Sequence, residues 1–203
     1  MNMNVKKNVM VIAIILIMIL LLISGYVIYC IIFDNTSKEK EPNTLSGQLL
    51  IDRQTEKINQ MYVAIIDDIM SKDSALNSQA KYIALDSNSF RRPKTTKSQQ
   101  DEEEYPSITE DTKNFLVEYC KKYHPTIMCA SFQELKQQGL FNEETYSLEG
   151  ILLYVQKIEK LTENKAILTL AKYRSGLGAI FPEYELTYKD GQWEVKVLSM
   201  AIS

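Results

Sequence analysis

Histidine is nearly absent from this chain, in which His124 is the only one among 203 residues. The chain has three cysteines, Cys30, Cys120 and Cys129, and no two of them stand at C-x-x-C spacing. A structural zinc site takes four nitrogen or sulfur ligands at short, regular spacings, so this set argues against one. A Ser-His-Asp or Cys-His hydrolase would also depend on His124 alone. We expect His124 to be a surface residue near a helix C-terminus, where its charge suits the helix dipole.

The two later cysteines are candidates for a disulfide rather than for a redox site. Cys120 and Cys129 are nine positions apart across Pro125, and exported cysteines usually pair. A bridge needs Cα atoms about 4.4–6.8 Å apart, which sequence spacing cannot establish. The sequence therefore leaves a Cys120–Cys129 bridge and two free thiols as open alternatives.

Phosphate-binding loops and paired catalytic carboxylates are missing as well. The SGLG segment at 175–178 lies between two predicted strands and not before a helix, so we expect a bend or bulge. Glu183 and Glu185 share one strand face, and their alternation with Tyr184 and Leu186 indicates a solvated outer face. The acidic run 101–104 lacks a calcium-loop pattern. We therefore expect no catalytic residue, no metal and no cofactor, and a protein that is not an enzyme.

What the chain does have is one long apolar run, because no residue from Val9 to Phe33 is charged. About 20 such residues cross a hydrocarbon core, so this run predicts a transmembrane helix at 9–33. A cleaved signal peptide is the alternative, since Lys6 and Lys7 precede the run. The run is roughly twice the length of a signal-peptide core. The bulky Tyr29 before Cys30 also argues against cleavage or lipidation. We predict an uncleaved signal anchor.

The orientation follows from the same two lysines. Lysines resist translocation while acidic residues count for little, which favours residues 1–8 as a cytoplasmic tail and the rest as extracytoplasmic. The formal net charge of the whole chain is −3, and Lys6 and Lys7 lie before the span. The part of the chain after the span therefore carries a more negative net charge. Nucleic acids and anionic lipid surfaces are bound mainly through clustered basic residues. We expect neither as a partner, and the sequence sets no oligomeric state.

The part of the chain after the predicted span divides into a tether and one domain. Residues 34–47 are polar and predict a short tether, and 48–203 predict a single extracytoplasmic domain. Apolar residues at helical spacing over 48–86 predict one long helix or two consecutive ones. Residues 87–107 are basic and then acidic, with almost no apolar residues, and predict an exposed flexible loop.

The sequence of the rest of the domain predicts two helices followed by a sheet. Thr109 is a predicted N-cap for a helix that ends before Pro125, and Ser131 caps a short helix that ends at Gly139. Asp190-Gly191 is a strong hairpin signal. The fold class is therefore α+β, with helices packed on a curved antiparallel sheet of three or four strands. The predicted strands are 166–174, 180–189, 192–202 and 148–161, the last of which also fits a helix.

The sequence Tyr-x-Leu-x-Tyr-Lys-Asp-Gly-x-Trp-x-Val at 184–195, after helices and long strands, resembles the NTF2-like or cystatin-like α+β folds. With an N-terminal anchor, the architecture is similar to VirB8-like proteins of bacterial secretion and conjugation machines. The resemblance covers residues 108–203 and implies a fold that hosts enzymes, binders and scaffolds alike. No active-site motif of an NTF2-like enzyme is present.

Aromatic residues gather in the predicted sheet, and some on its open face would suit a protein interface. From these features we expect a non-catalytic, membrane-anchored interaction module that serves as a scaffold or accessory part of a bacterial envelope assembly. The alternatives are an immunity or inhibitor protein against a toxin that acts outside the cytoplasm, and an envelope enzyme with an NTF2-like pocket. The predicted interaction face comprises Tyr173, Phe181, Tyr184, Tyr188 and Trp193.

Overall fold

The computed structural model describes residues 45–95 and 104–203, with side chains from Leu49 onward. Residues from Leu49 to Ser203 form one compact unit. The predicted tail and anchor, at 1–8 and 9–33, lie outside the described residues, as does most of the tether. Among the described residues, no helix combines the length and the apolar character needed to cross a membrane.

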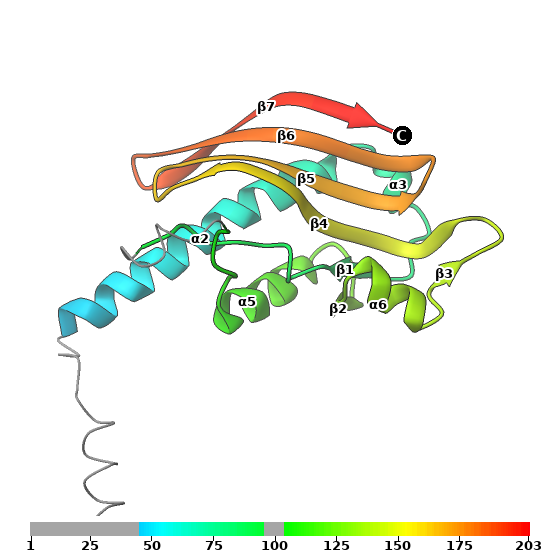
Figure 1. Cartoon of the computed structure of the whole chain (residues 1–203), viewed down its shortest axis with the longest axis horizontal. Coiled ribbons are helices and arrows are strands. Elements are labelled where there is room, and N and C mark those ends of the chain that lie inside the picture. Colours follow the sequence, from blue (N-terminus) through cyan, green and yellow to red (C-terminus); the bar gives the residue numbers. More distant parts are fainter. Residues whose placement is uncertain (1–44, 96–103) are drawn as a thin grey trace, which may run out of the picture. The chain divides into compact units, whose positions relative to one another are not determined.

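The domain is an α+β fold whose described part holds a seven-stranded mixed sheet and four helices. β1 runs parallel to both β2 and β4, and all other pairings are antiparallel. Figure 1 shows the long meander of β4 to β7, with the short β1 and β2 beyond β4. The path across the sheet is β2 (Ile127–Cys129), β1 (Ile83–Leu85), β4 (Ser147–Leu161), β5 (Lys165–Ser175), β6 (Gly178–Lys189) and β7 (Gln192–Ile202), and β3 (Phe141–Asn142) pairs with β4.

Tight turns hold the meander together, as the sequence predicts. Asp190 and Gly191 both have positive φ, at 49° and 85°, which a two-residue hairpin turn with right-handed twist requires. Gly176 and Leu177 turn the chain between β5 and β6 inside the SGLG segment. The three strands predicted from their alternation are confirmed, and the ambiguous segment 148–161 is a strand.

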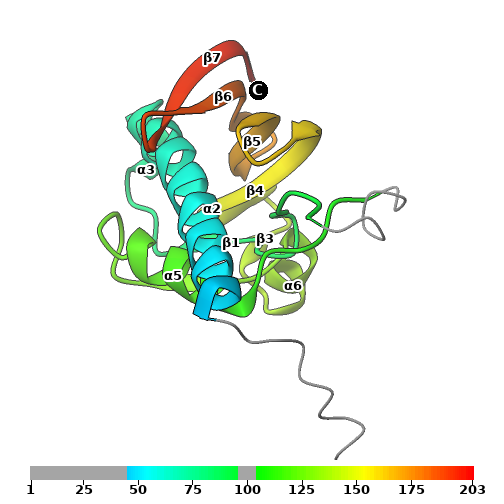
Figure 2. The same cartoon turned by 90° about the vertical axis from the view of Figure 1, so that its left-hand side faces the viewer.

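The helices are α2 (Leu45–Ser71), α3 (Ser74–Asn77), α5 (Glu110–Cys120) and α6 (Phe132–Gln137). Both predicted N-caps are confirmed. The Thr109 side chain accepts a hydrogen bond from the Thr112 N–H, and Ser131 and Glu134 form a reciprocal capping box. In Figure 2, α2 lies between the meander and α5.

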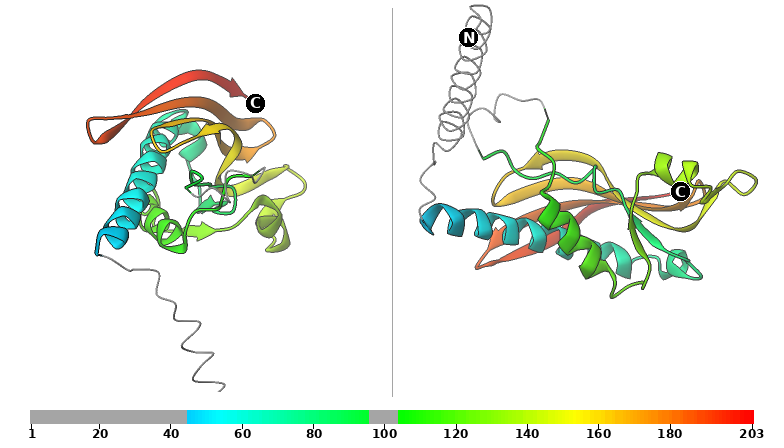
Figure 3. Two further views of the ribbon diagram at one scale, coloured as in Figure 1. Left: turned by 60° about the vertical axis from the view of Figure 1, so that its left-hand side comes forward. Right: turned by 90° about the horizontal axis from the view of Figure 1, so that it is seen from below.

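The main core lies between α2 and the helix-facing side of the meander. Tyr62, Ile65 and Ile69 of α2 are fully buried and belong to one cluster with Leu168 and Leu186 of the sheet. A smaller cluster surrounds α6, where Leu135 packs with residues of β1 and β4. The two further views of Figure 3 show α2 along one side of the meander.

Three sequence expectations need correction. The sheet has seven strands because the short strands β1, β2 and β3 join the four predicted ones. Its direction is mixed because Ile83–Leu85, predicted as helix, is a buried strand parallel to both β2 and β4. Such a strand is apolar on both faces and shows no alternation that would separate it from a helix. α2 also begins at Leu45, inside the predicted tether at 34–47.

The predicted exposed loop at 87–107 is only partly exposed. Phe90 is fully buried and packs edge-to-face on Tyr62, with ring centroids 4.8 Å apart. The Tyr62 hydroxyl donates to the Arg91 carbonyl at 2.6 Å, and Arg91 forms a β-bridge with Ser107. One aromatic side chain is therefore enough to fix the first part of a polar segment. Its middle, 96–103, lies outside the described residues.

A candidate binding groove beside helix α2

The apolar stripe of α2 continues beyond the core. Tyr62 and Ile65 are fully buried, whereas Leu49, Leu50 and Ile51 are 53, 58 and 57 % exposed. Exposed apolar residues grouped on one helix turn indicate a binding surface more than scattered ones do. The helical spacing of apolar residues begins at this turn, so Ile51 belongs to the apolar stripe of α2 although it is exposed.

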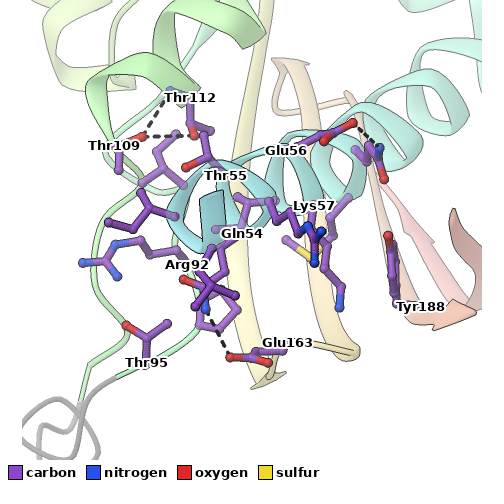
Figure 4. Close-up of a pocket in the computed structure, with 18 of the residues that line it drawn as sticks. Gln54, Thr55, Glu56, Lys57, Arg92, Thr95, Thr109, Thr112, Glu163 and Tyr188 are labelled. Carbon is purple, nitrogen blue, oxygen red and sulfur yellow. Dashed lines mark hydrogen bonds between the residues drawn. The ribbon is translucent and has the colours of Figure 1, made fainter. Parts of the chain in front are cut away.

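A groove of about 640 Å³ opens beside this first half of α2. In Figure 4, Arg92, Thr95 and Thr109 lie on one side of the helix, and Lys57 and Tyr188 lie on the other. Binding sites of this size bury most of a small ligand or several side chains of a partner. The groove therefore has room for part of a protein segment beside the exposed helical turn.

The sheet side of the groove is built around Lys57. Its Nζ lies 3.8 Å from the centroid of the Tyr188 ring and donates to the Asn164 Oδ1 at 2.5 Å. The Trp193 Nε1 donates to the Lys57 carbonyl at 2.8 Å. Burial lowers the pKa of Lys57, and the negative charge of Glu163 opposes this shift. These contacts fasten α2 to the β6–β7 hairpin and give the groove a rigid aromatic wall.

The opposite side comes from the segments that flank residues 96–103, namely those around Arg92 and Ile108. Pro93 is buried, and the Arg92 N–H donates to the Pro106 carbonyl at 2.8 Å. Ile108 is buried beside the N-cap of α5, where Thr109 accepts from the Thr112 N–H at 3.3 Å. This wall is held by backbone hydrogen bonds and is preformed in the same way as the first.

The polar groups of the groove are charged and amide side chains. Arg53 and Arg92 line it together with Glu56 and Glu163. The Gln54 Nε2 donates to the Glu163 Oε1 at 3.4 Å. In the part of the chain that the structure describes, no three His, Cys, Asp or Glu side chains are grouped as metal ligands. The groove offers apolar contacts with a charged rim.

The five aromatic residues predicted as one interaction face do not share a face. Tyr188 and Trp193 are partly buried and line the groove. Tyr184 is fully buried, and its hydroxyl donates to the Asp68 Oδ2 at 2.7 Å. Tyr173 packs on Phe132, on the other side of the sheet. Phe181 shares that side, because the register aligns Tyr173 with Ala179 two residues before it.

Cys120 and Cys129 are free thiols in the structure, so neither forms the disulfide that the sequence left open. Cys120 is buried in the core while Cys129 is exposed on β2. Burial raises the pKa of Cys120 to about 12, which keeps it an unreactive thiol. His124 is partly exposed, and its Nδ1 accepts from the Thr126 N–H at 3.0 Å.

The two paired glutamates lie on the outer face of β6. The Ser199 hydroxyl donates to the Glu183 Oε2 at 3.0 Å. Glu185 forms an ion pair with Lys165, whose hydrogen bond and charge lower the pKa of Glu185. Both carboxylates are therefore in polar surroundings, which agrees with the solvated outer face that the sequence predicts.

Comparison of the chain with protein-family models, with curated proteins and with solved structures finds no match. The assignment of the groove as a binding site is therefore based on its geometry alone. Its apolar mouth is visible in the sequence as the run Leu49-Leu50-Ile51 at the start of a helical pattern.

Proposed function

We propose that this chain is a membrane-anchored, extracytoplasmic interaction module and that a partner protein binds the groove beside α2. The observation that carries the proposal is the exposed apolar turn Leu49–Ile51 at the mouth of a preformed groove. A large apolar surface left in water favours association. The predicted span at 9–33 would hold this surface close to a bilayer.

The partner segment that fits is apolar with charged side chains at its edge. Leu50 and Ile51 offer the apolar contact, and Arg53 and Arg92 lie along the same groove. Tyr188 and Trp193 add a rigid aromatic wall of the kind that concentrates binding energy in protein interfaces. An anionic lipid surface is a poorer occupant because the chain is acidic overall.

The packing of the core favours a binding module over an envelope enzyme. The space between α2 and the sheet is filled by apolar side chains, among them Ile65, Leu168 and Leu186, where an NTF2-like enzyme would carry a cavity. The antiparallel meander of β4 to β7 supports the NTF2-like resemblance over residues 108–203, whereas α2 and β1 lie outside those residues. The identity of the partner separates a scaffold from an immunity or inhibitor protein.

Photo-crosslinking in the full-length chain tests the groove. A photoreactive amino acid in place of Ile51 should crosslink to one defined protein in intact cells. The same residue in place of Leu177, which is 94 % exposed on the β5–β6 turn, is the matched control and should not. Crosslinking of Ile51 to lipid alone, or an identical product from both positions, would overturn the groove as a protein-binding site.

Membrane attachment is tested separately. The full-length chain should stay in the pellet after extraction of membranes with alkaline carbonate, and deletion of residues 9–33 should release it. Full-length chain in the supernatant of cells broken without detergent would refute the anchor, and with it this proposed function.

A further inference from the structure

β7 forms one edge of the sheet, and Figure 1 shows it as the outermost strand of the meander. Within the described residues it pairs with β6 alone. The opposite edge is β2, which has only three residues and so offers little to pair with. β7 has eleven residues, and a long edge of this kind needs protection against pairing with another strand.

The two halves of β7 differ in that protection. Glu194 and Lys196 stand in the first half, and charges are a usual guard of sheet edges. From Val197 to Ser203 there is no charged residue. Four apolar side chains in this half are exposed, namely Val197 at 36 %, Leu198 at 43 %, Met200 at 44 % and Ile202 at 67 %.

The hydrogen bonds to β6 fix which backbone groups face outward. Ala179 and Ser203 exchange both of their N–H···O bonds, at 3.1 and 3.0 Å. In an antiparallel ladder such pairs alternate with pairs whose backbone groups point away from each other. The N–H and C=O groups of Met200 and Ile202 therefore point away from β6, toward the free edge.

We propose that this half of β7 pairs antiparallel with the same half of β7 from a second copy of the chain. Only one register sets both outward-facing residues against each other, with Met200 of each copy opposite Ile202 of the other. Each opposed pair then exchanges two hydrogen bonds, and the apolar side chains of the pair meet on the same face.

A second copy suits this edge better than an unrelated charged strand. The edge is neutral and apolar, so it matches itself, whereas a charged strand would lose hydration against it without gaining an ion pair. The pairing is isologous, which closes the assembly at a dimer. The ladder is short, so we expect a weak, concentration-dependent dimer.

The twofold axis of this dimer passes midway between the Ala201 residues of the two copies, which makes the register testable. Ala201 lies opposite Ala201 of the second copy in a pair without mutual hydrogen bonds, where Cα atoms are about 4.5 Å apart. This distance is within the range for a disulfide. The full-length chain with Cys30→Ser and Cys129→Ser should therefore form a disulfide-linked dimer in its membrane when it also carries Ala201→Cys. Cys120 can remain because it is buried.

Two matched variants in the same background control the experiment. Ser199→Cys places a thiol on the same face of the same strand, two residues from the axis, and Leu177→Cys places one on the remote β5–β6 turn. We expect the dimer yield of Ala201→Cys to exceed both by about tenfold, since only its sulfur atoms meet. A monomeric Ala201→Cys chain, equal yields from the three variants, or linkage to a different protein would overturn the proposal.

Discussion

The side chain of Lys172, on β5, binds the backbone of Lys72 at the carboxyl end of α2. Its Nζ donates to the Lys72 carbonyl at 2.6 Å and to the Asp73 carbonyl at 3.0 Å. Lys172 is fully buried. Carbonyl groups at a helix C-terminus have no partner within the helix, and they carry partial negative charge that a lysine complements.

Replacing Lys172 with Met keeps the volume of the side chain and removes both hydrogen bonds. We expect Lys172→Met to lower the free energy of unfolding by about 1–3 kcal/mol at neutral pH, because the carbonyl groups of Lys72 and Asp73 lose their charged donor. Urea denaturation followed by circular dichroism measures this. A free energy equal to that of the wild type would mean that the carbonyls find other donors.

The same lysine predicts a dependence of stability on pH. Burial lowers the pKa of Lys172 to about 8, opposed by the negative charge of Asp73. The ordinary lysine pKa of about 10.4 applies in the unfolded chain, which therefore binds more protons between these two values. The contribution of Lys172 to stability should then rise as the pH increases from about 8 toward about 10.4. The difference in the free energy of unfolding between wild type and Lys172→Met, measured by urea denaturation across this range, isolates this contribution. Tyrosines also titrate in this range, but their contribution is the same in both proteins and cancels.

Asp67 joins α2 to α5 through three donors. The Tyr123 and Tyr119 hydroxyl groups donate to its carboxylate at 2.6 and 2.8 Å, and Lys122 lies 2.9 Å from Oδ1. Partial burial raises the pKa of Asp67, but the hydrogen bonds from Tyr123, Lys122 and Tyr119 outweigh it and leave the pKa below its ordinary value.

We expect Asp67→Asn to cost about 1 kcal/mol at neutral pH, a small value because the pair is partly exposed. A lowered pKa in the folded state means that stability is lost as the pH falls through and below the ordinary value of about 3.9. The difference between wild type and Asp67→Asn should therefore shrink on acidification. Acid titration of both proteins under partly denaturing urea checks this, and a difference that grows at low pH would contradict it.

The sequence predicts well the elements that depend on local signals. Thr109 and Ser131 cap their helices, and Asp190-Gly191 turns the last hairpin, because neighbouring residues decide these features. It fails for Ile83–Leu85, which is a strand only because β2 and β4 lie on both sides of it. It fails in the same way for Phe90, since the composition of a polar segment does not show which part of it folds back on Tyr62.

Gly150 on β4 lies against Tyr82, the residue before β1. A Cβ atom at this position would lie 2.4 Å from the Tyr82 ring and 2.6 Å from the Tyr82 carbonyl oxygen. We expect Gly150→Ala to destabilise the domain by about 1–3 kcal/mol, because the backbone oxygen cannot rotate away as a side chain would. Gly176→Ala is the matched control, since nothing lies within 4 Å of the added atom. Thermal unfolding of both variants should show a lower midpoint for Gly150→Ala only.

Trp193 connects the groove to the stability of the domain. Trp193→Phe keeps an aromatic ring beside Tyr188 and removes the hydrogen bond to the Lys57 carbonyl. We expect a loss of about 1 kcal/mol in the free energy of unfolding. Because this bond positions α2 at the groove, the crosslinking yield from Ile51 should fall in the same variant under conditions where it remains folded. An unchanged yield would show that the hydrogen bond from Trp193 to α2 does not contribute to partner binding.

Cys129 reports the side of the membrane on which the domain lies. It is exposed on β2, whereas Cys120 is buried and its raised pKa keeps it unreactive. In a chain with Cys30→Ser, a membrane-impermeant maleimide should therefore label Cys129 alone, and Cys129→Ser should abolish the label. We expect labelling in intact cells, because the positions of Lys6 and Lys7 favour an extracytoplasmic domain. Labelling that appears only after the cells are broken would place the domain in the cytoplasm and exclude partners outside it.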